Sequence, residues 1–154
     1  MILADLAGAW TGTNGFRLMP SDPQSELPAT AALSSAAGGH LTVLTYTWQH
    51  PDDGPQDGLL LVAAAAEGDA VTATWGDSWH QKPDTMMLTG HRADDGAVSL
   101  EGSYAGDWAW QIQLATSEAG ELRLQMNNVI PSGHATAEIP AGPYPVMLLT
   151  ARRT

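Results

Sequence analysis

Large apolar side chains alternate with polar or small ones along much of this chain. The clearest stretch lies between residues 108 and 114, where every second position is large and apolar: Trp108, Trp110, Ile112 and Leu114. Successive side chains of a β-strand point to opposite faces, so this spacing predicts a half-buried strand whose tryptophan side faces the interior. A helix would instead repeat its apolar positions about every 3.6 residues.

Similar segments recur between turn-forming residues. The expected strands are 8–17, 41–48, 58–66, 70–75, 85–91, 98–104, 108–115, 122–129 and 145–152, with a weakly patterned segment at 29–37 and a loop at 20–28. Asp57, the alanines and Gly68 also suit a short helix over 58–66. We prefer a strand there, because a three-residue turn at 67–69 is of a length that joins antiparallel neighbours. About ten short strands at this spacing predict an all-β barrel or sandwich.

Composition agrees with many short elements in one domain. The chain has 154 residues, and its 16 glycines and 10 prolines are scattered between apolar runs instead of being pooled in a linker. This length suits a single domain over residues 1–154. Six tryptophans against one phenylalanine is an unusual choice of aromatic residues. Because a buried indole N–H needs a partner, this choice suits a pocket or an interface.

Charge and cysteine content exclude several classes of function. The formal net charge of −11 would repel phosphate backbones and anionic membranes, and the only adjacent basic pair is Arg152-Arg153. Neither nucleic acid nor membrane is therefore an expected partner. The absence of cysteine excludes disulfides, thiolate catalysis and cysteine-ligated metals. The first residues lack a basic, apolar leader and the apolar run at 59–66 is too short to span a bilayer, so we expect a soluble cytoplasmic protein.

The opening strand and the order of the later ones carry a family resemblance. Gly8-Ala9-Trp10 forms a Gly-x-Trp at the start of the first strand, and a basic residue stands near the end of the last one. With about ten antiparallel strands between them, the chain resembles the calycin superfamily of lipocalin-like barrels over nearly its whole length. It is most similar to uncharacterised bacterial lipocalin-like domains, whose Trp-x-Asp-Ser segment and Met-containing strand are matched at 75–80 and 86–90. The resemblance implies a single antiparallel up-and-down β-barrel that binds a small, partly apolar molecule inside.

The same resemblance implies how the barrel closes. Calycins stack the late basic residue across the indole of the Gly-x-Trp motif, a cation–π contact of about 1 kcal/mol when it is partly shielded. Arg152 or Arg153 would take that place against Trp10. This contact would close the barrel and would not be the ligand site.

The densest group of chemically versatile residues is the segment 75–82. Trp75, Asp77 and Trp79 would share one face of a regular strand and His80 the other, while a bulge near Gly76 would change which set faces inward. In the functional interpretation, aromatic walls bind an apolar body and Asp77 or His80 fixes its polar end. In the alternative interpretation, a buried tryptophan simply precedes a polar turn. The alternation of side chains along a regular strand is compatible with both interpretations.

Other residues complete the predicted ligand site. The full set of predicted ligand-binding residues is Asn14, Tyr46, Trp48, Trp75, Asp77, His80, Met87, Tyr104, Trp110 and Met126. Trp110 is a candidate wall, although a filled core is the more common fate of such a stripe. Asn14 shares the Trp10 face, so if buried it needs hydrogen bonds, and a ligand would supply one. Methionines adapt to varied ligand shapes.

Metal, cofactor and enzymatic functions are weaker alternatives. The five histidines lack the close spacing of a metal motif, so no metal site is expected. Nitrobindin-like calycins bind haem through a late histidine, which the last strand lacks, so His134 or His80 would have to substitute. Ser78, His80 and Asp77 are too close in sequence for a nucleophilic triad. An acid–base pair of His80 and Asp77 stays open, and no catalytic residue is assigned.

A purely interactive role is the remaining alternative. Leu59, Leu60 and Leu61 are consecutive, so at least one large apolar side chain of this strand faces outward. An outward leucine suits a homodimer interface on a barrel with a filled core. The sequence therefore predicts small-molecule binding first, and haem binding or dimerisation as alternatives.

Overall fold

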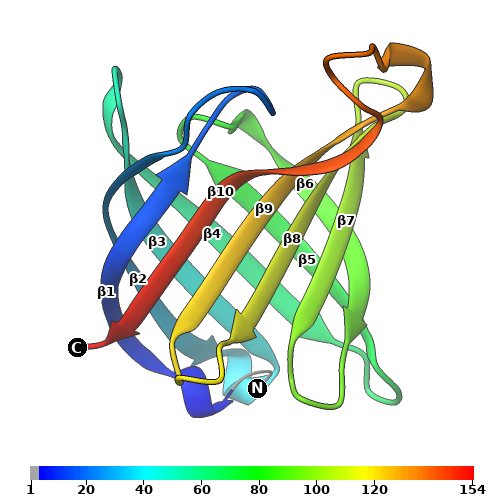
Figure 1. The fold of residues 1–154 in the computed structure, drawn as a ribbon. Helices are drawn as coiled ribbons and strands as arrows, with labels where there is room; N and C mark the ends of the chain where they lie inside the picture. Colours follow the sequence, from blue (N-terminus) through cyan, green and yellow to red (C-terminus); the bar gives the residue numbers. More distant parts are fainter. Residues whose placement is uncertain (1–3) are drawn as a thin grey trace.

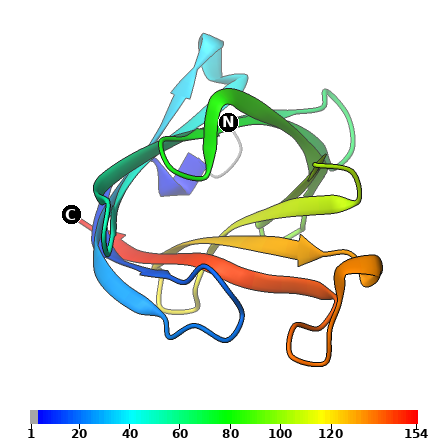
Figure 2. The same ribbon diagram turned by 90° about the horizontal axis from the view of Figure 1, so that it is seen from above.

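The computed structural model describes residues 4–154 as a closed barrel of ten antiparallel strands (Figure 1). The strands are β1 (Gly8–Phe16), β2 (Ser25–Ala36), β3 (Leu41–His50), β4 (Gly54–Ala64), β5 (Ala70–Asp77), β6 (Gln81–Arg92), β7 (Val98–Tyr104), β8 (Trp108–Thr116), β9 (Leu122–Ile130) and β10 (Gly142–Arg153). Each strand pairs with the next, and β10 pairs with β1, so the ring is closed when viewed along the barrel (Figure 2). The predicted all-β up-and-down barrel is confirmed.

Three single-turn 3-10 helices complete the described chain: η1 (Ala4–Leu6), η2 (Ala37–Gly39) and η3 (Ser132–His134). The structure over 54–64 is a strand, so the preference for a strand over a helix in that segment is confirmed. The expectation of a loop throughout 20–28 is wrong at its end, because β2 begins at Ser25. Its early residues pair with the end of β1, and alternate positions of β2 carry the small inward residues Ala29 and Ala31. No helix among residues 4–154 is long and apolar enough to cross a membrane.

The lower end of the barrel in Figure 1 is the end at which β1 begins and β10 finishes. The Arg153 guanidinium lies 4.7 Å above the Trp10 ring and donates hydrogen bonds to backbone carbonyls of residues 5 and 7. The Trp10 indole N–H donates to the Leu6 carbonyl at 3.0 Å. The predicted stacking of a late arginine on Trp10 is therefore present, and Arg153 provides it. Arg152 instead pairs with Glu121, its Nε lying 2.9 Å from the carboxylate.

The backbones of β1 and β10 approach each other closely near the contact between Arg153 and Trp10, where the barrel closes. A Cβ placed on Gly12 would lie 2.0 Å from the Thr150 carbonyl oxygen of β10, so only glycine fits there. The interior is filled along most of its length. Its largest side chains with almost no exposed surface are Tyr46, Trp48, Trp75, Leu44, Leu60, Leu88, Ile112, Leu114, Leu122, Leu124, Met126 and Met147. The aromatic members of this set come from the upper halves of β3 and β5.

Candidate functional site

An aromatic cluster fills the upper end of the barrel, where the β1–β2, β3–β4, β5–β6, β7–β8 and β9–β10 connections lie (Figure 1). We use this name for seven residues from β1, β3, β5, β8 and the β5–β6 turn: Phe16, Trp48, His50, Trp75, Trp79, His80 and Trp110. His80 lies within it, stacked on Trp48 with ring centroids 5.3 Å apart and planes inclined by 17°. Trp75 and Trp110 are stacked in the same way at 5.1 Å.

The Asp77 carboxylate is the polar centre beneath this cluster. It is 4% exposed and accepts four hydrogen bonds. One oxygen accepts from the Tyr46 hydroxyl at 2.8 Å and the Trp48 indole N–H at 3.2 Å. The other accepts from the backbone N–H groups of Trp79 at 2.9 Å and His80 at 2.8 Å. A buried carboxylate requires such compensation, and here its acceptor capacity is largely used by the protein itself.

Glycine at position 58 allows Tyr46 to reach Asp77. Gly58 pairs with Tyr46 on one side and with Asp77 on the other, so it lies between them on the inner surface of the sheet. A Cβ on Gly58 would lie 2.2 Å from the Tyr46 ring. The tyrosine therefore crosses the space that a side chain would take, and its hydroxyl also accepts the Trp75 indole N–H at 2.9 Å.

The β5–β6 turn brings two consecutive side chains over the barrel interior. The pairing of β5 with β6 shifts register between Trp75 and Asp77, as the predicted bulge near Gly76 requires. Beyond Asp77 the strand ends, and its carboxylate accepts the backbone N–H groups two and three residues on, those of Trp79 and His80, which is the local geometry that aspartate favours in turns. Strict alternation therefore stops, and both Trp79 and His80 join the aromatic cluster.

Burial sets the protonation states of two residues here. It lowers the pKa of His80 from 6.5 to about 4, although the Asp77 carboxylate acts in the opposite direction. The imidazole is therefore neutral at neutral pH. The pKa of Tyr46 lies well above its ordinary value, mainly because the hydroxyl is buried and secondly because the Asp77 carboxylate is close to it. Tyr46 thus stays a hydroxyl donor to Asp77.

A second histidine supports Trp79 from the rim. His50 stacks on the Trp79 ring at 4.7 Å, and its Nδ1 accepts the backbone N–H groups of Asp52 and Asp53 at 3.2 and 3.0 Å. The Trp79 indole N–H donates to the Asp53 carboxylate at 2.7 Å. The β3–β4 connection therefore holds Trp79 in place over the barrel end.

A small cavity of about 90 Å³ opens beside this cluster, between β5, β6, β7 and β8. It is lined by Trp75, His80, Gln81, Met86, Tyr104 and Trp110. The Tyr104 hydroxyl donates to the Asn128 side-chain oxygen at 2.6 Å, and burial raises the pKa of Tyr104. The cavity has room for a few water molecules or a small organic group. Its lining residues carry no permanent charge.

Two of the cavity-lining residues carry buried nitrogens without a hydrogen-bond partner: His80 Nε2 and Trp110 Nε1. Asn14 is fully buried on β1, and its side-chain amide atoms Oδ1 and Nδ2 also have no hydrogen-bond partner. Buried polar groups are nearly always paired, and an unpaired one costs about 1–3 kcal/mol. Unpartnered groups on two residues of one cavity therefore mark the place where a bound molecule would contribute most.

The predicted site residues fall into three groups. The structure brings together Tyr46, Trp48, Trp75, Asp77, His80, Tyr104 and Trp110 around the upper end. Met126 is fully buried in the interior, and Asn14 lies two residues along β1 from Phe16. Met87 was expected to line the interior, and this is wrong. It is 65% exposed on the outer face, because Met86 and Leu88 take the inward positions of β6.

Six residues of this end are missing from the predicted ligand-binding set, although they shape Asp77, the aromatic cluster or the cavity: Gly58, Phe16, His50, Trp79, Gln81 and Met86. A glycine within an otherwise apolar strand pattern was the available signal for Gly58. Ser78 does not act with His80, since its hydroxyl donates to Gln56 and accepts the Asp57 N–H. Among residues 4–154, no group of three acidic, histidine or cysteine side chains is placed to hold a metal ion.

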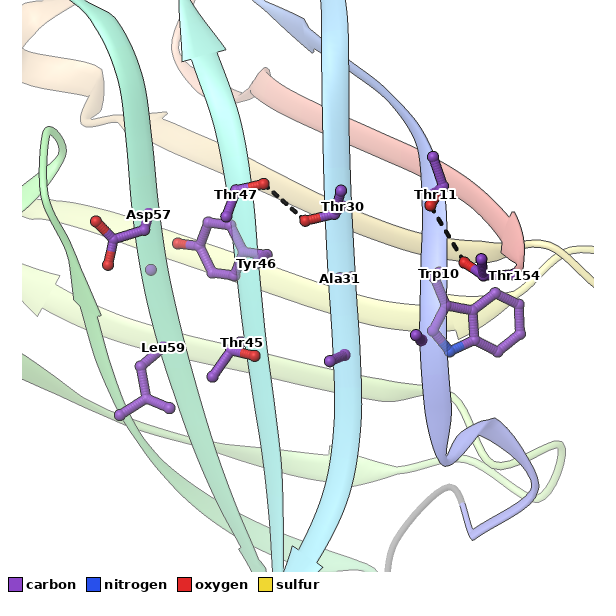
Figure 3. Close-up of a pocket in the computed structure, with 13 residues that line it drawn as sticks. Trp10, Thr11, Thr30, Ala31, Thr45, Tyr46, Thr47, Asp57, Leu59 and Thr154 are labelled. Atoms are coloured by element: carbon purple, nitrogen blue, oxygen red, sulfur yellow. Dashed lines mark hydrogen bonds between the residues drawn. The ribbon is translucent and has the colours of Figure 1, made fainter.

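The largest hollow lies on the outer surface of β1 to β4 and measures about 720 Å³ (Figure 3). Its lining consists mainly of threonine and alanine residues, and four of the threonine hydroxyls form two hydrogen-bonded pairs. Thr30 and Thr47 hydroxyls lie 2.7 Å apart, and those of Thr11 and Thr154 lie 3.2 Å apart. Leu59, 44% exposed, borders it. Four of its five threonine hydroxyls have partners, and none of its lining residues carries a buried polar atom without one, so this hollow is a weaker candidate than the cavity beside His80.

Comparison with known proteins adds no family assignment. The chain matches no protein-family model, and no curated protein shows significant sequence similarity to it. The closed ten-stranded antiparallel barrel is compatible with a calycin-like fold. The geometry of the upper end is therefore the basis for assigning a function.

Proposed function

We propose that the barrel binds a small, partly apolar molecule at its upper end, with the polar group of that molecule in the cavity beside His80 and Trp110. The observation that carries this proposal is the pair of unpartnered buried nitrogens on two residues that line one cavity. Aromatic walls with a few polar groups are typical of ligand sites. The cavity is small, so most of the ligand body would extend outward past Gln81.

Haem is a poorer fit to this barrel. The aromatic cluster contains two histidines, and of these His80 alone lines the cavity. It is packed between Trp48 and Trp110. A cavity of about 90 Å³ does not accommodate a porphyrin unless these rings move. The exposed Leu59 alone does not favour dimerisation over ligand binding.

Native mass spectrometry of the purified chain, compared with the same sample after denaturation, tests the proposal. A mass excess that denaturation removes would identify a bound compound directly. Side-chain ¹H–¹⁵N spectra would then show whether it shifts the Trp110 indole signal. We expect such a shift, since Trp110 Nε1 lacks a partner in the protein.

Trp110→Phe is the informative variant, because it removes the N–H and keeps an aromatic ring in the wall. Trp108→Phe is its matched control: Trp108 lies on the same strand but contacts Tyr104 and His134 at the rim. Binding should weaken in Trp110→Phe and stay unchanged in Trp108→Phe. Equal weakening in both would place the ligand elsewhere and contradict the proposal.

A further inference from the structure

We propose that the group recognised in the cavity is an uncharged hydroxyl, whose oxygen accepts the Trp110 indole N–H and whose proton is donated to His80 Nε2. This inference rests on the binding function proposed above and specifies its ligand class.

The Trp110 indole is a donor only, so the ligand must present an acceptor to it. The required role of His80 follows from its tautomers. If Nε2 carried the proton, two unpartnered N–H groups would lie in neighbouring rings, whose centroids are 5.2 Å apart. Unpaired buried N–H groups are rarer than unpaired acceptors, which favours an Nε2 that accepts. The ligand must then donate as well.

One oxygen atom can serve both nitrogens. Two hydrogen bonds of about 2.8 Å that meet at a bent hydroxyl oxygen join atoms roughly 4.6 Å apart, and the two nitrogens belong to neighbouring rings whose centroids lie 5.2 Å apart. A hydroxyl has one donor and two acceptor lone pairs, so it leaves little unpaired. A primary amide also donates and accepts, but its additional N–H and lone pair would need further partners, and the other polar side chains of the lining, Gln81 and Tyr104, already donate to Asp84 and Asn128.

Neither an anionic nor a cationic group suits this cavity. A carboxylate or phosphate would enter without a counter-ion, close to the backbone N–H of His80 that already serves the buried Asp77 carboxylate. The net charge of −11 opposes anions at longer range as well. An ammonium has three donors and no acceptor, so the Trp110 N–H would stay unpaired. Ethers and ketones have no proton for His80.

A series of probes of similar size tests the ligand class: 1-butanol, methyl propyl ether, butyrate and butylammonium. Each is titrated at pH 7 while the Trp110 indole and His80 imidazole nitrogens are observed by NMR. We expect butanol to shift both signals and to bind about ten-fold more tightly than the ether. The ether cannot donate a hydrogen bond to His80 Nε2, and it therefore leaves that buried acceptor unpaired. Butyrate and butylammonium should leave both signals in place.

The outcomes separate the ligand class from the binding function. Tighter binding of butyrate, butylammonium or the ether at these same signals would overturn the hydroxyl assignment and keep the site. A ¹⁵N shift showing a protonated Nε2 in the free protein would also overturn it. If none of the probes moves either signal and native mass spectrometry finds no bound compound, the binding function itself fails. Trp110→Phe should weaken butanol binding, whereas Trp108→Phe should not.

Discussion

The two ends of the barrel are closed in different ways, and two tryptophans make the difference concrete. Trp10 at the lower end and Trp110 at the upper end are both buried. The Trp10 N–H is paired with the Leu6 carbonyl and its ring is covered by Arg153, whereas the Trp110 N–H has no partner. The lower end is thus complete within the chain. The upper end has polar groups that only a bound molecule or water would satisfy.

The upper end also depends on a buried charge, which the lower end lacks. Asp77 accepts four hydrogen bonds there from Tyr46, Trp48, Trp79 and His80. Among residues 4–154 no other carboxylate is buried, and at the lower end the Arg153 guanidinium lies near the surface. Substitutions at the upper end should therefore cost more stability than those at the lower end.

The largest effect is expected for Asp77→Ala. This change leaves the Tyr46 hydroxyl, the Trp48 N–H and two backbone N–H groups without their acceptor, so the free energy of unfolding should fall by about 3–5 kcal/mol. Urea denaturation followed by circular dichroism measures it. Asp53→Ala is the control, since Asp53 also accepts an indole N–H at this end but is 58% exposed. A loss below 1 kcal/mol for Asp77→Ala would show that the carboxylate is not the structural centre.

Gly58→Ala should have the next largest effect. The new methyl group would meet the Tyr46 ring and push its hydroxyl away from Asp77, at a cost of about 2–3 kcal/mol in stability. Gly76→Ala on the neighbouring strand is the control, because its Cβ would meet only Thr85 at an ordinary 3.5 Å. Thermal denaturation compares the two variants. The combination of Gly58→Ala with Tyr46→Leu should cost less than the sum of the single changes, and strict additivity would argue against the clash.

A smaller effect is expected from pH. The pKa of His80 is about 4 in the folded protein and about 6.5 when unfolded, so between these values the unfolded chain binds more protons. The contribution of His80 to stability is fully present above pH 6.5 and is lost as pH falls toward 4. Its size is about 1–3 kcal/mol. The upper end should thus loosen first on mild acidification.

His80→Phe isolates this contribution, because it keeps a ring in the aromatic cluster and removes the titrating group. The free energy of unfolding of the variant should decline less steeply between pH 6.5 and pH 4 than that of the wild type. His91→Ala, at an exposed position on the outer face of β6, should leave the wild-type slope unchanged. Equal slopes in wild type and His80→Phe would mean that His80 titrates normally in the folded state.

The sequence predicts the fold better than the site. Alternation over residues 108–114 and the turn residues between strands identify the barrel, since pairing and burial follow directly from a period of two. The Trp10–Arg153 contact follows the calycin resemblance. The segment 25–28 was missed because β1 imposes the pairing there, which local composition does not reveal.

The site depends on departures from the period that the sequence expresses poorly. Met87 was placed inside, but the register of β6 turns Met86 inward instead. Trp79 and His80 both enter the cluster only because Asp77 ends the strand and binds their N–H groups. Whether the interior is open or filled depends on side-chain packing between strands far apart in sequence, such as Trp75 against Trp110. No pattern within one strand contains that information.

The smallest effect is expected at the lower end, for Arg153→Ala. Loss of the contact with Trp10 and of hydrogen bonds near the surface should reduce stability by about 1 kcal/mol. Arg152→Ala should change it less, because that side chain is 83% exposed and only pairs with Glu121. In both variants the Trp110 indole signal and any probe binding should stay as in the wild type, since the two ends are separated by the filled interior. A shift of the Trp110 signal in Arg153→Ala would mean that closure of one end controls the other, and the division between a structural end and a binding end would fail.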